Sequence, residues 1–148
     1  MRIKMKLLAF DFGTKKIGVA VGQTITKTAE PLNLIKIKNN MPDWIKIKKL
    51  KKEWEPNLII LGLPLNMNNT EQIFTKKTKK FANNLRNILN IPVELHDERL
   101  TTIEAKINIL NNLEHKNLKK INIDSYSAVL ILESWLKNNK NKFKHKNR

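Results

Sequence analysis

Four acidic residues stand out because each adjoins the end of an apolar segment. Asp11 follows the run Leu7–Phe10, Asp97 and Glu98 end an alternating stretch that begins at residue 93, and Asp124 precedes the last apolar segment. A carboxylate at the end of a buried segment costs free energy unless a metal ion, a hydrogen-bond network or solvent compensates it. These acids are therefore the candidates for chemistry.

Together the acids would form a metal site if the fold brings them to one point. Neighbouring carboxylates raise one another's pKa values unless a cation holds them. The chain has no cysteine and three scattered histidines, and oxygen ligands alone favour Mg²⁺ or Mn²⁺. Two such ions roughly 4 Å apart, held by carboxylates, are the arrangement that hydrolyses phosphodiesters by in-line displacement. The pattern predicts a hydrolase of the two-metal-ion nuclease type.

Each acid also has a structural interpretation that the sequence leaves open. Asp11 could open a turn in which Gly13 supplies a positive φ angle. Asp97 or Glu98 could be a surface partner of Arg99, and Asp124 could cap the last helix. The case for metal binding is the joint one, in a basic chain.

The elements that would position these acids follow from hydrophobic periodicity. Apolar runs on either side of the turn at residues 13–16 predict a hairpin, and residues 24–37 a third antiparallel strand. Residues 39–43 are expected to end that strand and lead into a helix. Trp44, Ile47, Leu50 and Trp54 recur at helical spacing, which predicts a helix whose tryptophans are core anchors.

The second half of the chain alternates between strands and helices. Strands are expected at 58–61 and 93–99, the second ending in adjacent carboxylates and an arginine. Helices are expected at 71–90, from 101 and after 124, with Lys76, Lys77, Lys79 and Lys80 on a solvated face. We therefore expect an α/β fold with a mixed five-stranded sheet flanked by helices. We expect residues 1–136 to form one nuclease domain and residues 137–148 to form a basic, disordered tail. The acids converge if the first and last strands lie near the centre of the sheet.

The charge balance points to a polyanionic partner. The formal net charge is +16, and six of the basic residues lie in the last twelve positions without an acid, which leaves +10 for the body. Such an excess favours nucleic acid over an anionic membrane surface. Part of it follows from a composition crowded with Lys, Asn and Ile. No run approaches the length of a membrane span, so a cytoplasmic protein is expected.

Four motifs in this order resemble those of the YqgF family, the bacterial pre-16S rRNA nucleases also described as Holliday-junction-resolvase-like. They are Leu8–Lys15, Gly62–Leu65, His96–Thr102 and Asp124–Ala128, and the likeness extends to about Leu136. The resemblance implies a ribonuclease H-like fold related to RuvC resolvases and a cytoplasmic location. It also implies a role in maturing the 5′ end of small-subunit ribosomal RNA, with the small ribosomal subunit as a possible partner.

The resemblance also implies roles for individual residues. Asp11, Glu98 and Asp124 would be the metal ligands and catalytic acids, and Thr14, Lys15 and Arg99 would hold the substrate phosphate. One departure concerns the second acid, which RuvC-type resolvases place at the end of the fourth strand, where this chain has Gly62-Leu63-Pro64. The acid must then come from the fifth strand. The family pattern favours Glu98 over Asp97, and His96 is interpreted as structural.

Two other functions remain open at this point. One is a structure-selective DNA endonuclease acting as a dimer on branched DNA, and the other is a non-catalytic RNA-binding factor of ribosome assembly. The sequence does not decide between a monomer and a homodimer. The Asp-Phe-Gly-Thr motif is also similar to the first phosphate loop of the actin and Hsp70 ATPases. With four glycines, three of them within residues 13–22, a second glycine-rich phosphate loop is missing.

Overall fold

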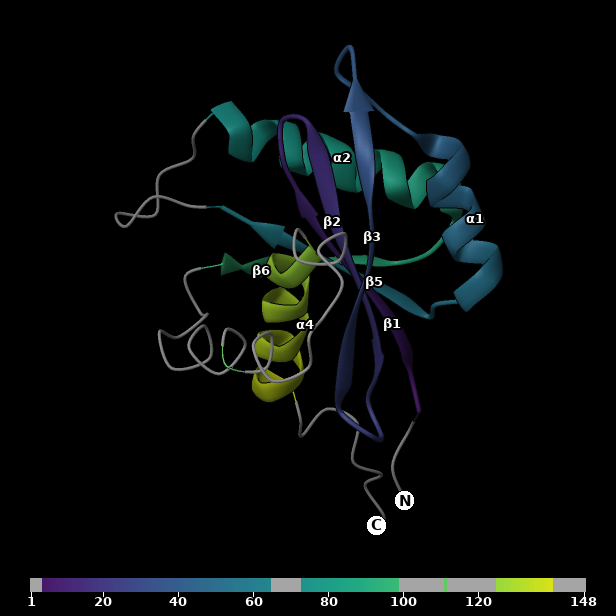
Figure 1. Ribbon diagram of the computed structural model, residues 1–148, viewed down its shortest axis with the longest axis vertical. Coiled ribbons are helices and arrows are strands. Elements are labelled where there is room, and N and C mark those ends of the chain that lie inside the picture. Colours follow the sequence, from purple (N-terminus) through teal and green to yellow (C-terminus); the bar gives the residue numbers. More distant parts are fainter. Residues whose placement is uncertain (1–3, 65–72, 99–110, 112–124, 140–148) are drawn as a thin grey trace.

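The chain folds around one six-stranded sheet with helices on both faces (Figure 1). The computed structural model describes residues 4–64, 73–98, 111 and 125–139. The strand order is β4-β3-β2-β1-β5-β6, so β1 lies inside the sheet and β6 at one edge. The α/β class and the mixed sheet are confirmed, with six strands where five were expected.

The first three strands form the predicted antiparallel meander. These are β1 (Lys6–Phe12), β2 (Lys16–Gln23) and β3 (Thr28–Lys38). In the first turn the Gly13 amide donates to the Lys16 carbonyl at 3.0 Å, and no described glycine has a positive φ angle. A Cβ on Gly13 would lie 2.7 Å from that carbonyl oxygen. Glycine is needed here for close backbone approach, and the positive φ suggested by the sequence is wrong.

The strand that the sequence did not predict is β4 (Met41–Pro42), which pairs with the end of β3. Asn39 and Asn40 connect the two strands, and their φ angles are 54° and 61°. Two consecutive positive φ angles are those of a tight hairpin turn, and asparagine tolerates them better than most residues. A two-residue strand has no periodicity, so the sequence pattern could not distinguish it from a loop.

The remaining two strands are parallel to β1, as predicted. The strand β5 (Leu58–Leu63) pairs with β1, and β6 (Val93–Asp97) pairs with β5. One strand therefore separates β6 from β1. The expectation that the first and last strands both lie near the centre is right for β1 and wrong for β6.

The sheet divides the core into two layers, each covered by helices (Figure 1). Helices α1 (Trp44–Trp54) and α2 (Ile73–Leu89) cover one face, and α4 (Tyr126–Asn138) covers the other. Along β1, Leu8 and Phe10 belong to the first layer, whereas Leu7 and Ala9 pack with α4. Since strand side chains alternate between faces, Asp11 continues the α4 face and Phe12 the opposite one.

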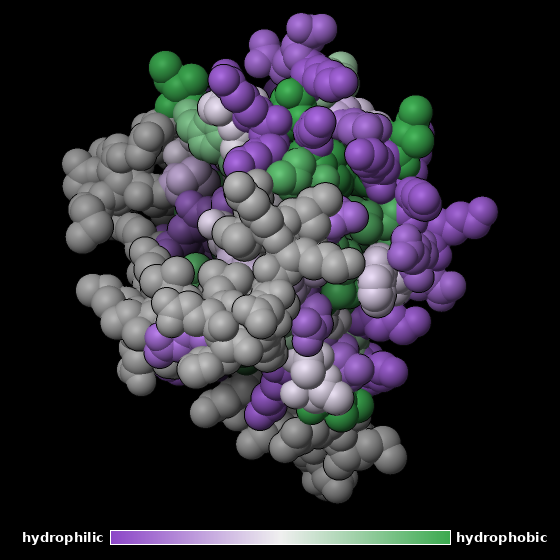
Figure 2. Space-filling view, in the orientation of Figure 1, coloured by the Kyte–Doolittle hydropathy of each residue, from purple (hydrophilic) through white to green (hydrophobic). Residues whose placement is uncertain are grey.

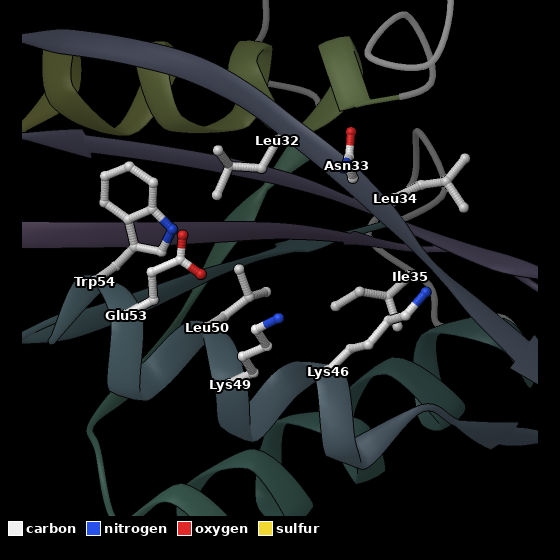
Figure 3. Close-up of a pocket in the computed structure, with 9 residues that line it drawn as sticks. All are labelled: Leu32, Asn33, Leu34, Ile35, Lys46, Lys49, Leu50, Glu53 and Trp54. Atoms are coloured by element: carbon white, nitrogen blue, oxygen red, sulfur yellow. The ribbon is translucent and has the colours of Figure 1, made fainter.

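The tryptophans behave differently from one another. Trp135 in α4 is 1% exposed, but Trp54 is 36% exposed. In α1 only Ile47 is fully buried. Trp54 lines a cleft of about 260 Å³ between β3 and α1, beside Leu50 and Leu32 (Figure 3). The interpretation of Trp54 as a core anchor is therefore wrong, because the last turn of α1 covers an open cleft where a closed core was expected.

Several predictions fall on residues outside the described part of the chain. They concern Arg99, Asp124, the helix expected from residue 101 and residues 140–148 of the tail. Helix α4 continues through Lys137 and Asn138, the first two residues of the predicted tail. Within the described residues, no helix is long and apolar enough to cross a membrane.

Candidate active site

Asp11 lies at the carboxyl end of the central strand β1. It pairs with Gly18 on β2, and its side chain is partly buried. The carboxylate takes part in hydrogen bonds with the side chains of Glu98 and Ser127. Residues from β1, from the end of β6 and from the first turn of α4 therefore meet at this point.

Glu98 reaches Asp11 by crossing β5 above a glycine. Gly62 of β5 is paired with His96 of β6, and the preceding residue Leu61 is paired with Phe10 of β1. Gly62 thus lies between the two acids in the sheet. A Cβ on Gly62 would lie 2.7 Å from Glu98 Oε1 and 3.1 Å from its Cγ. The strand end where RuvC-type resolvases have an acid is occupied here by Gly62, and a side chain at Gly62 would collide with Glu98.

Neighbouring contacts show which face of β6 turns towards α4. The indole N–H of Trp135 donates to Glu94 Oε2, and His96 Nε2 is 2.8 Å from Ser134 Oγ. Val93 and Leu95 pack in the opposite layer. The predicted alternation is confirmed for these residues. The observed contact with Asp11 supports Glu98 in the choice that the sequence left open with Asp97.

His96 connects β6 to α4 and is 6% exposed. Burial lowers the pKa of its imidazole, and the nearby carboxylates of Glu94 and Asp97 oppose that shift. A lowered pKa favours the neutral ring, which suits a hydrogen bond to a serine hydroxyl. These contacts agree with the structural interpretation of His96.

The N-terminus of α4 is attached to β2 next to Asp11. Ser125 is completely buried, and its Oγ accepts the Val19 amide hydrogen at 3.0 Å. The β2–β3 register shifts between Ile17 and Val19, immediately beside Gly18, the partner of Asp11. Ser125 and Ser127 are site residues that the sequence interpretation missed. Their signal was two serines spaced two apart at the start of a helix, directly after Asp124.

The surroundings of Asp11 disfavour the charged form of its carboxyl group. Burial raises its pKa above the usual 3.8, and the hydrogen bonds with Glu98 and Ser127 offset part of that rise. Two carboxyl groups that share a hydrogen bond need a proton or a cation between them. The donor atoms of Asp11, Glu98 and Ser127 are all oxygens, so they fit a hard divalent ion.

The described residues contain only part of the predicted ligand set. No group of three or more His, Cys, Asp or Glu side chains suitable for a metal occurs among them, and the third acid, Asp124, precedes the described residue Ser125. Thr14 and Lys15 are both exposed in the β1–β2 turn. The Lys15 carbonyl accepts the Ile37 amide hydrogen at 2.9 Å, which fixes the turn near the carboxyl end of β1.

A family model described as "Holliday junction resolvase" and named RuvX matches residues 5–138. The chain belongs to the RuvX family. A "Putative pre-16S rRNA nuclease" of Haemophilus ducreyi is 55% identical over 133 residues, which are 90% of this chain and 96% of that protein. A relative with the same name from Proteus mirabilis is 50% identical and covers 87% of this chain and 93% of its own length. The resemblance to the YqgF family is confirmed.

Solved structures show the same architecture at much lower identity. Thermus thermophilus RuvC, solved in complex with a Holliday junction substrate, has a TM-score of 0.64 at 13% identity and covers 95% of this chain and 98% of its own. The fowlpox virus Holliday junction resolvase has a TM-score of 0.54 at 13% identity, with coverages of 90% and 99%. At such identities the likeness establishes the fold, which is the ribonuclease H-like fold expected from the motifs.

Proposed function

We propose that this RuvX-family protein is a metal-dependent nuclease of the cytoplasm that processes the 5′ end of precursor 16S rRNA. The observation that carries the proposal is the contact between Asp11 and Glu98. It joins the carboxylate of Asp11 on β1 to that of Glu98, the residue after β6, across Gly62, in a chain with a net charge of +16. The names of the relatives supply the RNA substrate.

In this proposal the chain's own residues build a site for Mg²⁺ or Mn²⁺. Asp11, Glu98 and Asp124 hold the ions, which when bound supply Lewis-acid stabilisation of charge on the reacting phosphate. The hydrogen bond between Ser127 and Asp11 orients the Asp11 carboxylate, and Gly62 leaves room for the Glu98 carboxylate. Thr14, Lys15 and Arg99 bind phosphate oxygens, with Lys15 providing charge at the exposed turn.

The basic body attracts the RNA before chemistry begins. Figure 2 shows hydrophilic side chains gathered over α1, with hydrophobic groups between them. Helix α1 contains Lys48 and Lys52, both exposed. Lysines that neutralise phosphates release counterions, so the affinity for RNA falls steeply with salt.

Cleavage of precursor 16S rRNA and of a four-way DNA junction tests the proposal. Wild type, Asp11→Asn and the control Glu53→Gln, which removes an exposed acid on α1, are each assayed with Mg²⁺, Mn²⁺ or EDTA. We expect RNA cleavage by wild type and Glu53→Gln with either metal, and a loss of roughly 100-fold or more in Asp11→Asn. EDTA should abolish cleavage by all three proteins.

The other outcomes separate the competing functions. Cleavage that survives EDTA or Asp11→Asn would contradict the metal site. Cleavage of the junction alone would favour a resolvase, which the family description names. RNA binding without any cleavage would favour an assembly factor.

A further inference from the structure

A second cleft lies on the face of the sheet opposite Asp11, at the same end of β1. Its volume is about 430 Å³. The end of β1, the segment from β3 to the start of α1, and one side of α2 enclose it. The residues that line it are Phe12, Gly13 and Thr14, then Ile37, Asn40, Met41, Pro42 and Trp44, and finally Phe74, Lys77, Lys80, Phe81 and Asn84.

Aromatic rings line the inner part of this cleft. Phe12 is stacked on Phe74, with centroids 5.5 Å apart, and on Phe81, at 4.6 Å. The ring of Trp44 lies 5.8 Å from Phe81. Phe74 and Trp44 are only partly buried, so part of their apolar ring surface is open to a ligand. Such surfaces bind planar groups, nucleobases among them.

The rim of the cleft is basic and polar. Lys77 and Lys80 are exposed, and they lie three residues apart on α2, with Asn84 four residues further along the same face. None of the described residues that line the cleft carries a carboxylate. The sequence interpretation placed these lysines on a solvated face away from the apolar one, and the structure places two of them at the edge of the cleft. Apolar ring surface beside exposed positive charge suits a nucleotide.

The cleft between β3 and α1 differs in this respect. It contains one aromatic ring, Trp54, and its lining combines Lys46 and Lys49 with the carboxylate of Glu53 (Figure 3). The two clefts therefore share the combination of tryptophan and lysine, but only the larger one has stacked rings and a lining without a described acid. The smaller cleft is the natural control.

We propose that the larger cleft binds an unpaired nucleobase of the RNA strand, on the opposite side of the β1–β2 turn from Asp11. This inference rests on the proposed function for the identity of the strand. Phe12 follows Asp11 in the chain and faces the other way, so a strand that passes over the turn at Thr14 and Lys15 can contact both sites. Lys77 and Lys80 then neutralise neighbouring phosphates.

The arrangement implies a substrate that is single-stranded next to the cleavage site. A base that stacks in the cleft must leave its own helix, and unpaired segments release bases at the lowest cost. The chemical class of the ligand is thus a single-stranded RNA segment read by stacking, with little preference for sequence.

Binding of a fluorescent base tests this proposal without cleavage. The probe is a single-stranded oligouridine RNA with one central 2-aminopurine, titrated in EDTA with the full-length protein. We expect its fluorescence to fall on binding, because 2-aminopurine is quenched when it stacks. Trp44→Leu and Phe74→Leu should remove most of that quenching and weaken binding by roughly 5- to 150-fold. Trp54→Leu, in the smaller cleft, should leave both unchanged.

A pair of exposed lysines provides variants that do not disturb the core. Lys77→Gln with Lys80→Gln should lower the dependence of log affinity on log salt by about 1.4, because each phosphate contact on a single strand contributes about 0.7. Lys4→Gln with Lys27→Gln removes the same charge from exposed positions just before β1 and between β2 and β3, at the other end of β1 from the cleft, and should change the slope less. Equal slopes for the two pairs, or quenching that survives both Trp44→Leu and Phe74→Leu, would overturn the proposal.

The two proposals fail in different ways. Wild type that cleaves RNA but never quenches 2-aminopurine would remove the base-binding cleft and leave the nuclease intact. Quenching that depends on Trp44 and Phe74 without cleavage under any metal condition would support the cleft and remove the nuclease. Failure to bind single-stranded RNA at all would indicate that the cleft has another occupant, such as a protein partner, and would overturn the inference.

Discussion

Gly62 holds open the space through which Glu98 reaches Asp11. Replacing it with alanine would place a Cβ 2.5 Å from Ile131 Cδ1 and 2.7 Å from Glu98 Oε1. Both atoms are ends of side chains, and Glu98 is only partly buried whereas Ile131 is in the core. The fold should therefore survive while the carboxylate moves. Glycine is required here for the position of a neighbour's functional group, which makes it a positioning residue.

We predict that Gly62→Ala separates activity from stability. Metal-dependent cleavage should fall by about 10- to 100-fold, as for other groups that orient a metal ligand. The midpoint of urea unfolding should fall much less than the activity, since the close contacts are with the ends of two side chains and not with backbone. The midpoint and the Mn²⁺ concentration for half-maximal cleavage are measured together. Normal cleavage in Gly62→Ala would show that Glu98 needs no clearance.

The raised pKa of Asp11 predicts how metal-free stability depends on pH. A carboxyl group whose folded pKa lies above its unfolded value stabilises the fold below the unfolded pKa, near 3.8 here, and that contribution is lost as the pH rises through the folded pKa. In EDTA, wild type should therefore lose stability relative to Asp11→Asn as the pH rises above about 4. Urea unfolding of both proteins measures the difference.

Added Mg²⁺ provides the control for that comparison. It should stabilise wild type at neutral pH, because an ion that binds only the folded state shifts the equilibrium towards it, and it should not stabilise Asp11→Asn. A constant difference between the two proteins across the pH range would contradict the assignment of the raised pKa to Asp11.

At the scale of elements, Ser125 attaches α4 to the sheet. Its hydroxyl satisfies the buried amide of Val19 where the β2–β3 register shifts. We predict that Ser125→Ala lowers the free energy of unfolding by about 1–3 kcal/mol, because a buried amide would lose its acceptor. Ser127→Ala, at an exposed position in the same turn, should have a smaller effect. Urea unfolding decides, and equal effects would mean that Ser125 has no special structural role.

The sequence predicted the regular elements because their residues repeat with a clear period. The β1–β2 hairpin, the parallel strands and the helical spacing from Trp44 all follow from such patterns. The short strand β4 has no period, and its turn depends on two asparagines adopting positive φ angles. The exposure of Trp54 depends on what lies opposite the end of α1, which a helical pattern does not contain.

The sequence pointed to the acids of the candidate site but not to their arrangement. Asp11 and a second acid after the last strand follow from the sequence. The sequence does not show that the Glu98 side chain must cross β5 to reach Asp11. That follows from the strand order β1-β5-β6, which depends on how the strands pair. The missing acid at Gly62 was interpreted as a departure from a resolvase pattern. In the structure it is the space that the carboxylate of Glu98, just after β6, occupies.

At the scale of the whole molecule, the basic C-terminal segment should act through charge alone. Removing residues 140–148 deletes five of the basic residues and keeps Asn139, whose side chain donates to the Trp135 carbonyl. We predict weaker binding of RNA and DNA alike, with a salt dependence reduced by up to about 3.5 for single strands. The unfolding midpoint should not change.

A full-length chain with those five basic residues replaced by glutamine is the matched control. It should bind as weakly as the truncated protein. Truncation that lowers the unfolding midpoint, or a glutamine variant that binds like wild type, would show that the segment does more than supply charge. Filter binding across a salt series measures both proteins.

The central claim is that the chemistry depends on the carboxylate pair formed by Asp11 and Glu98. The most direct test compares substitutions of two adjacent acids, Asp97 at the end of β6 and Glu98 directly after it. The measurement is the rate of precursor 16S rRNA cleavage with Mn²⁺ by Glu98→Gln and by Asp97→Asn. The account predicts a loss of roughly 100-fold or more for Glu98→Gln and a rate within a few-fold of wild type for Asp97→Asn. The reverse result would contradict it, as would equal rates for the two variants.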